Sequence, residues 1–265
     1  MTISVVLVVH NQLPLTRACL DSLVTTTLPF DLCVVDNGST DGTEAYFREW
    51  PAGRPLRYRR NAENVGLIRA LNQGAQLSES DHLCFLHNDT EMRDPRWLDR
   101  LRTAVDGQSA AGLAGLYGAR RLRRDGRYVG RTIVSSLEGT GNLRAPVTEV
   151  AAVDGVCLFI ARPLLAAVGG FDEGYGFFHG YDRDLSFAVR EAGHRCVVVR
   201  APFVHRGGGT RTGAEAPRPP DRDLSERREA LARFARKWRH RLPTDVRRVP
   251  ERIADFLSPA GRPRG

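Results

Sequence analysis

Two aspartates at the start of a predicted helix are the first candidates for chemistry. The segment FFHGYDRDLSFAVREAG, residues 177–193, leads two aromatic residues and a glycine into Asp182 and Asp184. Acidic side chains are common in a first helical turn because the helix dipole favours them there. Two positions apart on a helix, they cannot share one face. An apolar stripe borders both, so periodicity does not choose between them.

Elements able to position these residues are predicted in the first third of the chain. Continuous β-branched runs are typical of strands that are covered on both faces. Helical patterns follow each of these strands, and prolines open two of them. The alternation predicts an α/β fold with a doubly wound, mainly parallel sheet. The strands are expected at residues 3–9, 32–35, 56–59 and 82–86.

Polar side chains come soon after each predicted strand. In a doubly wound sheet, ligands bind beyond the carboxyl ends of the strands. The polarity of these ends therefore predicts a ligand crevice. The residues concerned are His10, Asn11, Asp36, Asn37, Asn61, Asn64, His87, Asn88 and Asp89.

The usual phosphate-binding loops are absent from the sequence. No GxGxxG follows the first strand and no GxxxxGK[ST] occurs, which argues against dinucleotide dehydrogenases and P-loop NTPases. A hard divalent cation on Asp89 would neutralise a bound phosphate instead. The alternative is that Asp89 and Thr90 form only a turn before Pro95.

Composition and charge narrow the class of protein. Residues 211–265 hold 15 Arg and Lys against 8 Asp and Glu, so the basic character lies in the tail and residues 1–210 are nearly neutral. This distribution argues against nucleic acid as a partner. No apolar run approaches the length of a membrane span, and the first residues do not read as a signal peptide. The five cysteines have no CxxC spacing, which favours buried reduced thiols and a cytoplasmic location.

Six motifs in order, over about residues 3–210, resemble the family 2 glycosyltransferases of GT-A fold. The resemblance implies nucleotide-binding and acceptor-binding halves and an inverting sugar transfer from a nucleotide-diphosphate sugar, of UDP or dTDP type, to a small-molecule or glycan acceptor. The acceptor is expected to be a cell-surface glycan or a secondary metabolite. The motifs are VVHNQ, VVDNGSTDGT, NVGLIRALNQG, FLHNDTEM, VGGFDEGYGFFHGYDRDLSFAVREAG and FVHRGGGT.

The same resemblance assigns roles to individual residues. It aligns the family's catalytic base with Asp182 and leaves Asp184 as a structural residue. The family usually has an acidic residue before the base, and here that position is Tyr181. The acceptor side is assigned to Asp154, His179 and Tyr181. The residues expected to bind the donor are His10, Asn11, Asp36, Asn37, Asn64, Gly66, Asn72, His87 and Asn88.

The metal motif departs from the family pattern. Only its last position, Asp89, is acidic, and His87 and Asn88 stand in the other two. The resemblance implies a divalent metal, Mn²⁺ or Mg²⁺, held by Asp89 and His205. His87 is expected to contact the nucleotide rather than the metal, although an imidazole also suits Mn²⁺. His205, at the end of an apolar strand pattern, is otherwise only a strand-end histidine.

After the predicted catalytic domain, residues 1–210, the composition changes. Residues 211–222, rich in Gly and Pro, predict a flexible loop that is either an inert linker or a lid over the donor sugar. Residues 223–265 predict a helical extension and tail that begin with a capping box at Asp223 and Glu226. An apolar stripe on this helix is expected to pack on the catalytic body. The alternative is that the basic face of the helix contacts membrane lipid, as a peripheral membrane contact, or a phosphate-bearing acceptor. The stripe comprises Leu231, Phe234, Trp238 and Leu242.

Two other functions remain open at this point. A nucleotidyltransferase with a similar sheet would be expected to carry a glycine-rich, basic loop after the first strand, and VVHNQLPLT lacks one. A catalytically silent module that binds sugar nucleotides would not need Asp182 and Asp89. Hydrolysis of the donor with added metal distinguishes the enzyme from the silent module.

Overall fold

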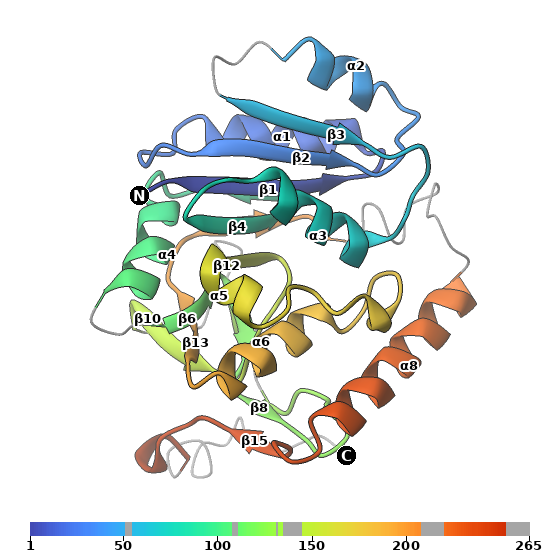
Figure 1. The fold of residues 1–265 in the computed structure, drawn as a ribbon. Helices are drawn as coiled ribbons and strands as arrows, with labels where there is room; N and C mark the ends of the chain where they lie inside the picture. The colour runs from blue at the N-terminus through green and yellow to red at the C-terminus, as the bar shows by residue number, and fades with distance from the viewer. Residues whose placement is uncertain (51–54, 108–110, 131, 135–144, 208–219, 253–265) are drawn as a thin grey trace.

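An eight-stranded sheet runs through the molecule (Figure 1). The computed structural model describes residues 1–50, 55–107, 111–130, 132–134, 145–207 and 220–252. The strands lie in the order β10-β13-β6-β12-β4-β1-β2-β3. They are β1 (Ile3–Val9), β2 (Asp31–Asp36), β3 (Leu56–Arg60), β4 (His82–His87), β6 (Ala111–Gly115), β10 (Val147–Val150), β12 (Cys157–Ala161) and β13 (Arg195–Val199).

The four predicted strands form the parallel half of this sheet. Strand β1 pairs in parallel with β2 and with β4, and β3 extends the sheet beyond β2. The register places Val9 opposite Asp36 and Val8 opposite His87, so the carboxyl ends of these strands are level. The polar residues that follow the strands are thereby gathered at one edge, as the sequence predicted.

The second half of the sheet is mixed. Strand β12 is antiparallel to both of its neighbours, β4 and β6. Strand β13 is parallel to β6, and β10 is antiparallel to β13. Strand β12 thus joins the parallel half of the sheet, through β4, to the half that contains β6, β13 and β10.

Helices cover both faces of the sheet. The β1 side chains alternate between two apolar clusters: Val5 and Leu7 pack with residues of α1, α2 and α4, and Val6 packs with residues of α3, α5, α6 and α8. This alternation follows from the two-residue period of a strand. The helices are α1 (Leu13–Leu23), α2 (Thr43–Arg48), α3 (Leu67–Leu77), α4 (Trp97–Asp106), α5 (Arg162–Ala167), the short 3₁₀ helix η1 (Glu173–Tyr175), α6 (Tyr181–Glu191) and α8 (Pro220–Lys237).

Among the residues that the structure describes, three small sheets accompany the large one. The most important for the site pairs β5 (Thr90–Met92) with β14 (Phe203–His205) in antiparallel register. His205 lies opposite Thr90 in this pair, which brings it beside Asp89. The other two pair β7 (Tyr117–Ala119) with β9 (Thr132–Val134) and β11 (Ala152–Val153), and β8 (Arg121–Leu122) with β15 (Thr244–Asp245).

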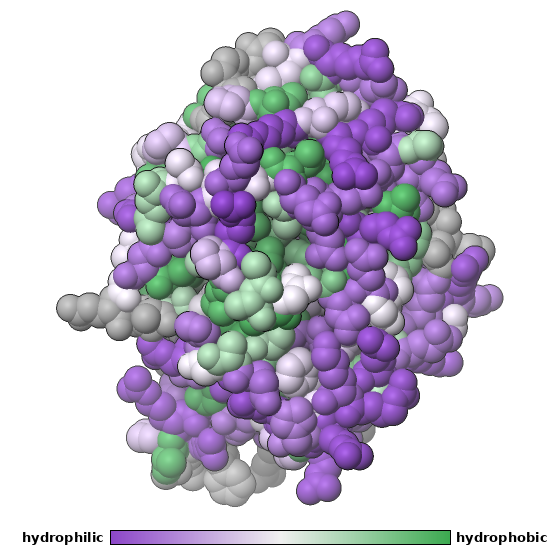
Figure 2. Space-filling model, viewed as in Figure 1, coloured by the Kyte–Doolittle hydropathy of each residue, from purple (hydrophilic) through white to green (hydrophobic). Residues whose placement is uncertain are grey.

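Helix α8 packs beside α6, and its outward surface is mostly hydrophilic (Figures 1 and 2). Phe234 is fully buried, Trp238 is 6% exposed, and the Phe234 ring meets the ring of Phe187 edge to face at 4.9 Å. The apolar stripe therefore packs on the body as expected. The predicted start was wrong: the helix begins at Pro220, so Asp223 and Glu226 lie inside it and form no capping box.

The sequence also led to predictions about the loop before α8, the cysteines and membrane-spanning helices. Most of the predicted loop 211–222 lies outside the described residues, and its last three residues open α8. All five cysteines are buried and free, as their spacing indicated. Within the described residues, no helix combines the length and apolar composition needed to cross a bilayer.

Candidate active site

A cavity of about 330 Å³ lies at the carboxyl edge of the parallel strands. Strand ends, the loop before α6 and the first turn of α6 line it, together with one face of α8. It brings together most of the residues that the sequence singled out. These are His10, Asn37, Asn64, His87, Asn88, Asp89, Asp154, His179, Tyr181, Asp182 and His205.

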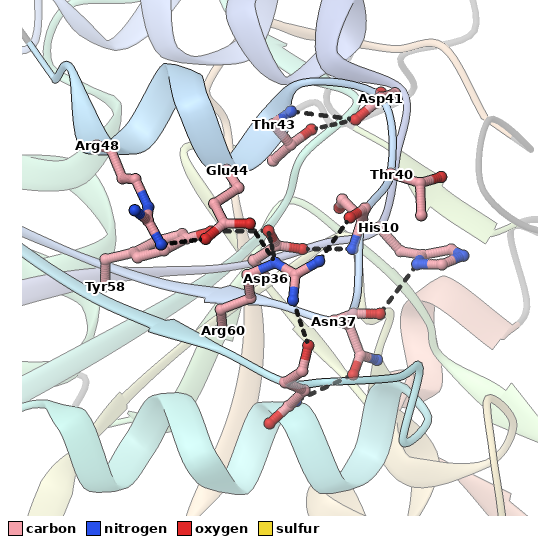
Figure 3. A network of polar contacts seen from close by, with 12 residues as sticks. His10, Asp36, Asn37, Thr40, Asp41, Thr43, Glu44, Arg48, Tyr58 and Arg60 are labelled. Carbon is pink, nitrogen blue, oxygen red and sulfur yellow. Dashed lines mark hydrogen bonds and ion pairs between the residues drawn. The ribbon is translucent and has the colours of Figure 1, made fainter.

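Amide side chains lie at the end of the cavity at β1 and β2. Figure 3 shows the polar contacts around two of the wall residues, His10 and Asn37. The side chain of Asn37 donates to Asn64 Oδ1 at 2.8 Å and accepts from Asn61 at 3.1 Å. One ring nitrogen of His10, Nδ1, lies 3.0 Å from the backbone oxygen of Asn37. These bonds hold His10, Asn37 and Asn64 in fixed positions on the cavity wall, where they are suited to bind a polar ligand.

Asp36, expected to bind the donor, does not line the cavity. Its side chain is fully buried and accepts hydrogen bonds from the Tyr58 hydroxyl and the Ser39 amide, at 2.7 and 2.8 Å. The Arg60 guanidinium lies 3.7 Å away (Figure 3). Asp36 thus ties β2 to β3 and shapes the turn that leads to the cavity.

Three other predicted donor-binding residues also lie off the cavity wall. Asn11 accepts from the Thr40 amide at 2.7 Å and so anchors the turn after β2. Asn72 exchanges hydrogen bonds with the backbone of Phe171, at 2.9 and 3.0 Å, which attaches α3 to the segment before η1. Gly66 precedes α3 with a φ of +93°, a conformation that favours glycine. These three residues hold the backbone near the cavity in place but do not line the cavity.

Three side chains on the cavity wall form a candidate metal centre. One ligand atom each from His87, Asp89 and His205 lies within 4.8 Å of the others. Asp89 Oδ1 and His205 Nε2 are 3.1 Å apart, because the β5–β14 pairing places them side by side. The sequence assigned His87 to the nucleotide, but the structure places it with the two predicted ligands.

The protonation states of His87 and Asp89 suit metal binding, whereas at His205 a metal competes with a proton. Burial lowers the pKa of His87 to about 4, so its imidazole is neutral near pH 7. Burial opposes ionisation of Asp89, but the neighbouring imidazoles of His205 and His87 outweigh it and lower the pKa of Asp89. Burial opposes the charged form of His205, but its hydrogen bond with Asp89 outweighs burial and raises the pKa of His205. Two imidazoles and a carboxylate fit a borderline or hard divalent cation such as Mn²⁺.

Asp182 lies in the first turn of α6 and lines the cavity near a second carboxylate. Gly180 caps this helix with a φ of +85°, and the ring of Tyr175 would clash with any Cβ there. Burial and the charge of Asp182 raise the pKa of Asp154 to about 7. Asp154 is therefore partly protonated near neutral pH, which limits repulsion between the two carboxyl groups.

Tyr181 connects α6 to the candidate metal centre. Its hydroxyl lies 3.1 Å from His87 Nε2. A Cβ on Gly155 would stand 2.0 Å from that hydroxyl oxygen, so only glycine leaves room for it. Sequence reasoning missed Gly155, because its requirement arises from contact with a residue far along the chain.

Asp184 faces away from the cavity toward the tail. It is 4% exposed and accepts hydrogen bonds from the Tyr175 hydroxyl at 2.9 Å and from Trp238 Nε1 at 2.7 Å. The Lys237 ammonium also donates to it at 2.9 Å. Asp184 is thus a structural residue, as expected from the sequence.

Part of the cavity wall comes from residues that the sequence did not single out for the site. Arg227, Ala230 and Leu231 of α8 line it, as do Phe178 and Arg183 around the start of α6. The i, i+3, i+4 spacing of the α8 residues was a signal that they share a face. The sequence did not show that this face continues past the core into the cavity.

Comparison with known proteins identifies the family. A sequence model of glycosyl transferase family 2 matches residues 4–166. The uncharacterized protein y4gI of Sinorhizobium fredii is 26% identical over 98% of this chain and 29% of its own length. The O-antigen biosynthesis protein RfbC of Myxococcus xanthus is 25% identical over 81% of this chain and 18% of its own length. The chain thus spans less than a third of either relative.

Solved structures show the same fold. GalNAc-T7, crystallised with UDP, GalNAc and Mn²⁺, superposes with a TM-score of 0.63 at 18% identity, over 77% of this chain and 44% of that one. The mannosyltransferase PcManGT of Pyrobaculum calidifontis, in complex with GDP-Man and Mn²⁺, gives 0.57 at 17% identity, over 89% and 73%. Because the family model matches more than half of its residues and these structures share its GT-A fold, the chain belongs to glycosyl transferase family 2.

Proposed function

We propose that the chain transfers a sugar from a nucleotide-diphosphate sugar to an acceptor hydroxyl, or a related nucleophile, with inversion of configuration. The observation that carries this proposal is that Asp182 and the cluster of His87, Asp89 and His205 line one cavity. An inverting transfer needs a base and a stabilised leaving group on opposite sides of the reacting carbon. One cavity holding a carboxylate and a separate cation site meets that need.

The proposed base is Asp182. Its carboxylate takes the proton of the acceptor nucleophile as that atom attacks the anomeric carbon. The bond between this carbon and the diphosphate oxygen breaks, and the electron pair leaves with the nucleoside diphosphate. Asp154 has a raised pKa and is partly protonated, so less negative charge stands beside Asp182 where the electron-rich acceptor would bind.

The proposed nucleotide site is the amide-rich end of the cavity, at His10, Asn37 and Asn64. GalNAc-T7 was crystallised with UDP and PcManGT with GDP-Man, which supports a nucleotide-sugar donor for this chain. We infer a donor of UDP or dTDP type. The relative RfbC is named for O-antigen biosynthesis, which favours a cell-surface glycan over a secondary metabolite as the acceptor.

The proposed cofactor is a divalent metal held by Asp89 and His205, with His87 as a third ligand. When bound, such a cation supplies positive charge that stabilises a departing diphosphate. Because two of the three side chains are imidazoles, the donor set favours Mn²⁺ over Mg²⁺. The proposed compartment is the cytoplasm, where the five buried thiols stay reduced.

Calorimetry with nucleoside diphosphates tests the metal site. UDP, dTDP and GDP are titrated with Mn²⁺, with Mg²⁺ and in a chelator, and Mn²⁺ is expected to tighten binding of the preferred nucleotide at least tenfold. Asp89→Ala should abolish this gain and His205→Ala should reduce it. Equal affinity in metal and in chelator would contradict the metal site, and no turnover of any nucleotide sugar in the presence of metal would contradict catalysis.

A further inference from the structure

Helix α8 builds part of the cavity that holds the proposed base. Arg227, Ala230 and Leu231 line it together with Asp182 and His179. On a helix, positions 223, 227, 230, 231 and 234 fall on one face because they are three or four residues apart. The face that is buried against the body near Phe234 therefore continues into the cavity nearer the start of the helix.

Polar contacts fix this helix on both sides of Arg227. On the near side, Asp223 Oδ1 lies 2.8 Å from His179 Nε2, which joins the helix to the loop before the base. On the far side, Arg233 pairs with Asp172 at 3.0 Å, and Trp238 bonds to Asp184. The backbone at Arg227 is thus held in a defined position relative to Asp182.

Arg227 differs from the other basic side chains on the inward side of α8. Arg233 and Lys237 both pair with Asp172, whereas Arg227 has no carboxylate partner within the part of the chain that the structure describes. It is solvent-exposed and stands at the rim of the cavity beside the apolar Leu231. A guanidinium in this setting is suited to bind a carboxylate or phosphate through paired hydrogen bonds.

We propose that Arg227 is a specificity residue that binds an anionic group, a carboxylate or a phosphate, of the acceptor. The inference rests on the proposed function. Its location favours the acceptor over the donor diphosphate: Arg227 follows Asp223 by one turn, and Asp223 contacts His179 in the loop that leads into the base. The proposed nucleotide contacts instead come from the strand ends at His10 and Asn37.

Calorimetry on the full chain tests this proposal with two anionic probes and a neutral one. Glucose 6-phosphate, glucuronate and glucose are titrated into the enzyme, both alone and saturated with Mn²⁺ and the best-binding nucleoside diphosphate. Both anions are expected to bind more tightly than glucose, and Arg227→Ala should weaken them about fivefold or more. The matched control, Arg228→Ala, removes the same charge from an exposed neighbour outside the cavity and should leave the affinities unchanged.

The outcomes separate this inference from the proposed function. Equal anion affinity in Arg227→Ala and the unaltered chain, or no preference for the anions over glucose, would overturn it. Weaker nucleoside diphosphate binding in Arg227→Ala would assign the residue to the donor, which also overturns it. Anion binding that depends on Arg227 in a protein that binds no nucleoside diphosphate would instead contradict the proposed function.

Discussion

Asp182 and Asp184 have different surroundings although they are two positions apart in α6. Asp182 lines the cavity, while Asp184 is buried against Tyr175, Lys237 and Trp238. Each residue turns a helix by about 100°, so side chains two positions apart point to nearly opposite sides. Asp182 is therefore available to substrate, whereas Asp184 makes internal hydrogen bonds. One helical turn thus carries both the proposed base and an anchor for the tail.

Conservative substitutions should separate these two roles. Asp182→Asn is expected to lower transfer by about 10²–10⁴-fold, the usual contribution of a general base, with little change in melting temperature. Asp184→Asn should lower the melting temperature and leave most of the activity of the folded enzyme, because it weakens buried bonds away from the cavity. Thermal melts and single-turnover rates measure both. An inactive but stable Asp184→Asn, alongside an active Asp182→Asn, would reverse the assignment.

At the scale of elements, α8 is held by an aromatic cluster and by ion pairs. Phe187 packs against Phe234 and Trp238, with ring centroids 4.9 and 5.7 Å apart. Because both tail rings are buried, the helix contributes to the free energy of folding as well as to the cavity wall. Docking of this apolar face on a membrane would require it to leave the protein.

Removing one tail ring should therefore destabilise the protein. Trp238→Ala is expected to lower the free energy of unfolding by about 3–5 kcal/mol, the range for large aromatic residues in a core. The control, Leu224→Ala, changes an α8 side chain that is 46% exposed and should have little effect. Chemical denaturation measures both. If Trp238→Ala left stability unchanged but abolished binding to anionic vesicles, the helix would be a membrane anchor instead.

The sequence predicted the local elements better than their long-range contacts. The β-branched run at residues 3–9 predicted a strand with the observed bounds, because burial on both faces leaves a clear pattern. The start of α8 was missed, because its polar residues resemble a cap while the helix begins at Pro220. The roles of Gly155 and Arg227 depend on contacts with residues far along the chain, which no local pattern encodes.

The site prediction shows the same limit. The polar strand ends gathered at one edge, because parallel strands in level register must bring their carboxyl ends together. Hydrogen bonds to residues distant in the sequence decide which of the predicted side chains face the cavity. Asn37 faces it, whereas Asp36 bonds to Tyr58 and Asn72 bonds to Phe171. Residue types predicted where the site lies, and tertiary contacts decided which residues form it.

At the scale of the whole molecule, charges hold the tail to the catalytic body. Asp172 accepts hydrogen bonds from Arg233 and Lys237, and Lys237 also pairs with Asp184 near the Tyr175 ring. Partial burial opposes ionisation of Asp172, but these cations outweigh it and lower its pKa below the ordinary 3.8. Burial likewise opposes the charge of Lys237, yet the two carboxylates raise its pKa above 10.5.

Stability should therefore fall at both extremes of pH. The contribution of Asp172 is fully present above pH 3.8 and is lost as the pH falls through its lower folded-state pKa. The contribution of Lys237 is fully present below pH 10.5 and is lost as the pH rises through its higher folded-state value. Melting temperatures from pH 2 to 12 measure this, with Asp172→Asn expected to flatten the acid side. An unchanged acid side in that variant would contradict the role of Asp172.

The position of α8 in the chain has a consequence for synthesis in the cell. The parallel strands and the proposed base are all translated before residue 206, whereas Arg227 and Leu231 follow later and Trp238 later still. Because a nascent chain folds from its N-terminal side as it leaves the ribosome, the sheet can form while the cavity still lacks a wall. Until residue 238 has emerged, Phe187 of α6 lacks its aromatic partners and stays open to water and to chaperones. The rate of translation therefore sets the time between synthesis of the proposed base and completion of the cavity wall.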